Sequence, residues 1–192
     1  MASNKTHLSN FSRDKLAWPV YLTIRNISKS ICQKLSEKAT VLIGYIPVSK
    51  LECFSKSQCQ YQSYQVFHNC MCLLFEQLIK AGQEGVKMIC ADGLVHKVYP
   101  ILCTYVADHP KQCLVACNNE NQCSQYETGA KKLGLPLDSV LQSSEKTLDT
   151  MTSAKEGDDE EFVWLRLCSN NPFWQDLSHC DISSCFMPDL LH

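Results

Sequence analysis

A long amphipathic stripe between short apolar runs is the feature that most constrains this fold. Large apolar side chains recur every three or four residues in one stretch, which is the spacing of a single helical face. These positions are Tyr64, Phe67, Met71, Leu74 and Leu78. Gly82 and Gly85 follow them and predict the end of the helix, because glycine readily adopts the backbone conformations that close one. A helix with one apolar face needs a second layer to cover that face.

Short runs rich in β-branched and aromatic residues supply the second layer. Trp18–Ile24 and Thr40–Ile46 precede the helix, and we expect both to be buried strands. Val86–Ala91 follows the helix, and we expect it to be the central strand. Val98–Val106 then predicts a second helix, and Cys113–Ala116 a further strand. This order predicts an α/β fold, a mixed sheet flanked by helices.

Composition divides the chain into three parts. Residues 1–128 hold the strand and helix patterns and form a core with a Cys-rich end. Residues 129–161 are rich in Ser, Lys and Asp, and we expect a flexible acidic linker with one short helix near Ser139–Met151. Residues 162–192 are apolar again, so we expect this C-terminal segment to pack on the core.

The charge balance argues against a free-standing DNA-binding protein. The chain has 18 basic and 20 acidic residues and a formal charge of -2, whereas such proteins usually carry a basic face. No segment approaches the roughly 20 consecutive apolar residues of a membrane span, and Met1–Asn10 lacks the apolar region of a signal peptide. We therefore expect a nuclear or cytoplasmic protein, with no membrane partner. Its 13 cysteines are then expected to be mainly reduced.

Asp92 is a candidate metal ligand, because it follows the strand predicted at Val86–Ala91. A carboxylate at a strand end can meet a carboxylate from a neighbouring strand, and Mg²⁺ prefers such oxygen ligands. Two metal ions held in this way clamp the attacking and leaving oxygens of phosphoryl transfer. The simpler interpretation is that Asp92–Gly93 makes a turn after the strand.

A second candidate site is a cluster of thiols with one histidine. The spacing of His109, Cys113, Cys117 and Cys123 allows a four-ligand Zn²⁺ site. It does not follow a standard zinc-finger pattern, because Tyr126 stands where a second Cys of a CxxC would be. The alternative is a set of reduced, partly buried thiols.

Four long stretches, in the same order, resemble the Plavaka transposases, a family of CACTA-related fungal DNA transposons. The stretches are WPVYLTIRNISKSI, ATVLIGYIPVSKLECF, VKMICADGLVHKVYPILCTYVADHPKQCLVACNNENQC and PFWQDLSHCDISSCFMPDLLH. The resemblance extends over nearly the whole chain except the region of Gly129–Glu161. It implies a DDE-type nuclease core of RNase H-like fold that acts on DNA with divalent metal ions such as Mg²⁺.

The same resemblance implies where the catalytic carboxylates should lie. Ser3-Asn4-Lys5-Thr6 resembles the family's S-D-K-T motif, so Asn4 occupies the degenerate position of the first catalytic Asp. The second acidic position falls on Asp92, and the third is expected beyond the final PDLLH. Because few residues precede Phe11, we expect a partial RNase H-like core whose first strand is largely missing.

Three functions remain open from the sequence. The first is a truncated, inactive remnant of a DDE-type transposase, which could associate with the full-length enzyme. The second is an active metal-dependent DNA nuclease completed by a partner chain. The third is a small zinc-stabilised interaction module built on the segment from Cys113 to Cys123.

Overall fold

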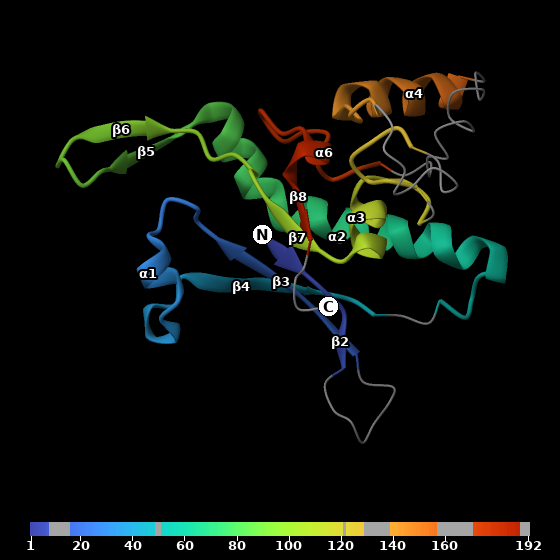
Figure 1. Ribbon diagram of the computed structural model, residues 1–192, viewed down its shortest axis with the longest axis horizontal. Coiled ribbons are helices and arrows are strands. Elements are labelled where there is room, and N and C mark those ends of the chain that lie inside the picture. Colours follow the sequence, from blue (N-terminus) through green and yellow to red (C-terminus); the bar gives the residue numbers. More distant parts are fainter. Residues whose placement is uncertain (8–15, 49–50, 121, 129–138, 157–170, 189–192) are drawn as a thin grey trace.

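The fold is α/β, built on a six-stranded mixed sheet (Figure 1). The computed structural model describes residues 1–7, 16–48, 51–120, 122–128, 139–156 and 171–188. The strands of the sheet are β1 (Ala2–Ser3), β2 (Thr6–His7), β3 (Leu16–Thr23), β4 (Thr40–Ile46), β7 (Tyr105–Ala107) and β8 (Phe186–Pro188). The strands predicted at Trp18–Ile24 and Thr40–Ile46 are thus confirmed as β3 and β4, but the expected burial of β4 is wrong, because four of its seven residues are exposed at the edge of the sheet.

The sheet combines an antiparallel half and a parallel half. On one side β4 pairs with β3, and β3 pairs with both β1 and β2, all antiparallel. On the other side β1 pairs with β7 and β7 with β8, both parallel. The order across the sheet is therefore β4, β3, β1 with β2, β7, β8.

The start of the chain forms an inner strand, which corrects the expectation that the first strand is largely missing. Ala2–Ser3 lies between β3 and β7, and Thr6–His7 continues along β3. The Met1 ammonium donates to the carbonyl of Thr104 at 2.9 Å, and Val106 N–H donates to the Met1 carbonyl at 2.8 Å. The sequence pattern did not predict this strand, because it is short and polar. Its stability comes from backbone hydrogen bonds to strands that are distant in sequence.

The long helix α2 spans Lys56–Glu84 and runs along the sheet (Figure 1). Its predicted apolar stripe faces the core, where Phe67 and Met71 are fully buried. Phe67 stacks on Trp18 of β3, with ring centroids 5.1 Å apart. The helix ends at Gly85, whose φ of 72° is unfavourable for other residues, so this predicted boundary is confirmed.

A separate hairpin follows α2 and corrects the expected position of Val86–Ala91. β5 (Val86–Ile89) pairs antiparallel with β6 (Val95–Val98) in a two-stranded sheet outside the main one (Figure 1). All four residues of β5 are exposed, so the prediction of a central buried strand is wrong. Cys90 to Gly93 form the tight turn, closed by a bond of 2.9 Å from Gly93 N–H to the Cys90 carbonyl. The chain therefore folds back on itself before it can enter the main sheet.

Two further sequence predictions are wrong for local reasons. Val98–Val106, expected as a helix, contains the end of β6, an irregular stretch around Pro100, and the start of β7. Cys113–Ala116, expected as a strand, belongs mostly to helix α3 (His109–Val115). Asp108 caps α3 and a proline occupies its first turn, both strong signals for a helix start.

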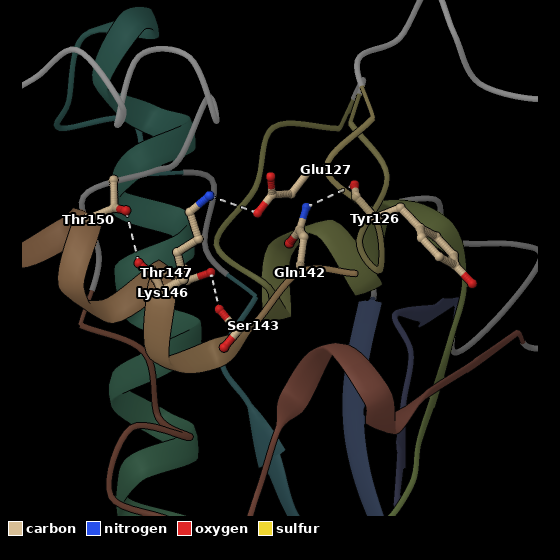
Figure 2. Close-up of polar contacts among 7 residues, drawn as sticks. All are labelled: Tyr126, Glu127, Gln142, Ser143, Lys146, Thr147 and Thr150. Carbon is tan, nitrogen blue, oxygen red and sulfur yellow. Dashed lines mark hydrogen bonds and ion pairs between the residues drawn. The ribbon is translucent and has the colours of Figure 1, made fainter. Parts of the chain in front are cut away.

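Among the described residues, the other helices are α1 (Lys29–Cys32), the 3₁₀ helix η1 (Leu35–Glu37), α4 (Ser144–Glu156) and α6 (Ile182–Cys185). α4 lies within the range expected to be a linker, and its Thr147, Thr150 and Met151 are buried. Figure 2 shows how the loop before it is held: Lys146 Nζ lies 3.0 Å from Glu127 Oε1, and Gln142 donates to the Tyr126 carbonyl at 3.3 Å. No helix in the described part of the chain is long and apolar enough to cross a membrane.

Candidate functional site

Asn4 and Asp108 lie at the same edge of the sheet. β1 and β7 are parallel with Ala2 opposite Val106, and each is followed directly by one of these polar residues. Two steps along both strands from that pair lead to Asn4 and Asp108, so the register sets them side by side and on the same face. Both side chains are half-buried. An amide and a carboxylate therefore follow adjacent strands at the carboxyl edge of the sheet.

Asp108 is held in place by the helix that it begins. Its backbone is extended (φ -67°, ψ 161°), and its Oδ1 accepts from the Lys111 backbone N–H at 3.0 Å. This cap fixes the carboxylate between β7 and α3. Sequence reasoning missed Asp108 because the segment before it was predicted to be a helix. The signal that identifies it is an Asp followed two residues later by Pro110, which marks the start of a helix.

Asp92 is not part of this edge. It lies in the exposed turn of the β5–β6 hairpin, and the expectation that it ends a strand next to that of Asn4 is wrong. Its Oδ1 accepts from Leu94 N–H at 2.9 Å, and its Oδ2 lies 2.7 Å from His96 Nε2. These bonds hold the pKa of Asp92 below its usual value, with the Leu94 N–H as the largest cause. The turn interpretation of Asp92–Gly93 accounts for this geometry.

The four candidate zinc ligands do not share one site. Cys113 Sγ lies 3.7 Å from His109 Nε2, whereas Cys117 Sγ lies 3.4 Å from Nε2 of His68, which is outside the expected set. Cys123 is half-buried, and its backbone carbonyl accepts from Asn118 and Gln142. No group of three or more His, Cys, Asp or Glu side chains that could hold a metal ion occurs among the described residues. His109, Cys113, Cys117 and Cys123 as placed here do not fit a zinc ion.

The sheet edge at Asn4 and Asp108 also lacks the ligands that Mg²⁺ needs. Of Asn4 and Asp108, only Asp108 carries a carboxylate. An amide offers a neutral carbonyl oxygen where Mg²⁺ favours an anion. In the part of the chain that the structure describes, no third acidic or histidine side chain completes a metal-binding group. The described residues therefore do not fit a two-metal centre.

His68 is a buried residue of the core, close to the cysteine segment. Its Nε2 donates to the Leu114 carbonyl at 3.0 Å, and its Nδ1 accepts from Phe173 N–H at 3.4 Å. Burial lowers its pKa to about 4, although the Leu114 carbonyl opposes that shift. The imidazole is thus neutral near pH 7, and both nitrogens are used to join α2, α3 and the C-terminal segment.

The fold and the sheet edge define an α/β protein with a polar site where two parallel strands end. Comparison with protein families makes this specific: the model described as Plavaka transposase matches residues 1–192, the whole chain. The chain belongs to the Plavaka transposase family. Neither the curated proteins nor the solved structures that were compared gave a match.

Proposed function

We propose that this chain is the RNase H-like part of a DDE-type transposase in which the first catalytic carboxylate has become Asn4, and that it does not cleave DNA by itself. The parallel pairing of β1 with β7 carries the proposal, because it sets Asn4 beside Asp108. A DDE-type site needs its first two acidic residues on such neighbouring strands. We therefore assign the second acidic position to Asp108 rather than to Asp92.

The order of the elements supports an RNase H-like core. The strands β1 to β4 come first along the chain, and β1, β2 and β4 all pair antiparallel with β3. The long helix α2 follows, after which β7 pairs in parallel with β1 and β8 in parallel with β7. α3 lies between β7 and β8 in sequence, as does the segment that includes α4. The β5–β6 hairpin is an insertion between α2 and β7.

Loss of the first carboxylate accounts for the proposed inactivity. Two metal ions stabilise the charge that develops in phosphoryl transfer, and this is worth several kcal/mol. Because each ~1.4 kcal/mol changes the rate tenfold, losing ~4 kcal/mol slows cleavage roughly a thousandfold. Association with a full-length transposase and a nuclear location belong to the same proposal.

A nicking assay tests the proposal. Supercoiled plasmid and oligonucleotide duplexes are incubated with the chain in Mg²⁺ or Mn²⁺, and nicked products are followed on gels. We expect no metal-dependent nicking by the wild type or by the Asn4→Asp variant, since the described residues supply no third ligand. Metal-dependent nicking that Asp108→Ala abolishes and Asp92→Ala preserves would show a working nuclease, and the proposed inactivity would be wrong.

A further inference from the structure

Two lysines from distant parts of the chain converge on one tryptophan ring. Lys5 Nζ lies 4.9 Å from the centroid of the Trp18 ring, and Lys111 Nζ lies 5.4 Å from it. Both distances are within the range of cation–π attraction. Phe67 stacks on the same ring, so the two ammonium groups share the space that Phe67 leaves open. Two positive charges are thus held close together on a buried aromatic platform.

Neither lysine makes an ion pair within the described structure. The ion pairs among the described residues join His96 to Asp92 and Lys146 to Glu127, and neither involves Lys5 or Lys111. Burial lowers the pKa of Lys5, and the charge of Lys111 lowers it further. Placing like charges together costs free energy, so an anion between them would relieve repulsion.

Trp18 itself carries an unused hydrogen-bond donor. The residue is 3% exposed, and its Nε1–H has no hydrogen-bond partner among the described residues. A buried donor without an acceptor costs about 1–3 kcal/mol. A small pocket of about 20 Å³ opens beside the ring on the side of Lys5; Trp18, Ile46 and Val48 also line it, and Lys111 does not. This volume admits a group of the size of one water molecule or one phosphate oxygen.

We infer that Lys5, Lys111 and Trp18 form a binding site for one phosphodiester group of duplex DNA. Lys5 directly follows Asn4, and Lys111 lies three residues after Asp108, so the site adjoins the sheet edge on both strands. A single phosphate oxyanion there accepts from the two ammonium groups that the Trp18 ring holds together. The identity of the ligand as DNA rests on the proposed function.

The two lysines provide positive charge on a chain whose net charge argues against DNA binding. A formal charge of -2 gives no basic face over the whole molecule, yet two lysines at one point supply a local positive potential. The lysines position the backbone of DNA and read no base sequence, because a phosphate contact is the same at every nucleotide. We therefore expect weak binding of duplex DNA that does not depend on its sequence.

Fluorescence anisotropy with a labelled duplex of about 20 base pairs tests the inference. Affinity is measured over a range of NaCl concentrations for the wild type, Lys5→Gln and Lys111→Gln. Each phosphate contact contributes about 0.9 to the slope of log affinity against log salt. Each substitution should therefore reduce the slope by up to about 0.9 and weaken binding roughly eightfold at 0.1 M salt.

Lys87→Gln is the matched control, because it removes the same charge from the exposed hairpin strand β5. It should leave the affinity within about twofold of the wild type, and Lys5→Arg and Lys111→Arg should keep most of the binding. Circular dichroism and thermal unfolding of each variant verify that its fold is intact.

Three results would overturn the inference. The first is an equal loss of affinity in Lys87→Gln, which would mean a diffuse charge effect. The second is an absence of duplex binding by the folded wild type. The third is displacement of the duplex by a few millimolar inorganic phosphate at constant ionic strength, which would assign the pair to a free anion. None of these three results concerns DNA cleavage, so the nicking assay tests the proposed function independently.

Discussion

Lowering the pH should destabilise this protein through one buried histidine. His68 is fully buried, and its Nδ1 accepts a hydrogen bond from Phe173 N–H, so a proton on Nδ1 has no place in the folded state. Burial lowers the pKa of His68 to about 4, whereas in the unfolded chain it has its ordinary value of 6.5. As the pH falls below about 6.5, the unfolded chain binds a proton at His68 and the folded chain does not, so the unfolded state is favoured.

The size of the effect follows from that difference. His68 contributes its full stability above about pH 6.5 and loses it progressively as the pH falls toward 4. At pH 5 the unfolded form is protonated and the folded form is not, which costs about 2 kcal/mol relative to pH 8. Below pH 4 the loss levels off at about 3 kcal/mol.

Urea unfolding at pH 8 and pH 5 measures this loss. With a urea dependence of about 2 kcal/mol per molar, the midpoint should shift down by about 1 M. His68→Gln keeps a polar side chain but has no titrating group, so its two midpoints should differ much less. His96→Gln, an exposed residue of the hairpin, should retain the wild-type shift. If His68→Gln and the wild type lose equal stability between the two pH values, the assignment of the pH dependence to His68 is wrong.

Two further predictions concern the metal site and the core. Asn4→Asp should create Mn²⁺ binding at the sheet edge, seen as paramagnetic broadening of NMR signals around Asp108. Adding Asp108→Asn to this variant should abolish the broadening. Broadening of the same signals in the wild type would contradict the assignment of the lost carboxylate to Asn4. Phe67→Ala should lower the free energy of unfolding by about 3–5 kcal/mol, because it empties the contact between Trp18 and α2. Leu73→Ala on the same helix, where the leucine is 75% exposed, should cost under about 0.5 kcal/mol in urea unfolding.

Local patterns predicted the elements whose stability comes from nearby residues. β4 has the predicted bounds, and α2 ends at the predicted glycine, because an apolar run and a helix-ending residue are both read within a few positions. Partners in the sheet could not be predicted in this way. Ala2 pairs with Val106 across more than a hundred residues, and no periodicity in either segment indicates the other.

The candidate site shows the same limit. Asp92 was chosen because it follows an apolar run, but the Asp-Gly pair makes the chain turn back and form a hairpin. Asp108 was missed because the run before it was interpreted as a helix, although Pro100 disfavours a helix over part of that run. Asp108 is a candidate site residue only because β1 lies beside β7, and that pairing depends on the topology of the whole sheet. The degenerate position at Asn4 came from the family resemblance and not from any pattern within the residues.

The position of β1 has a consequence for synthesis on the ribosome. This strand is made first, but its parallel neighbour β7 is made about a hundred residues later, and β8 reaches the edge only with Phe186–Pro188. Until then β1 has only the antiparallel partner β3, and the apolar side chains of α2 lack their cover from Phe173. Pairings over such separations form slowly, because a long loop must close before the contacts form. The nascent chain therefore carries an open sheet edge until β7 has been synthesised, a state that favours pairing with a second chain.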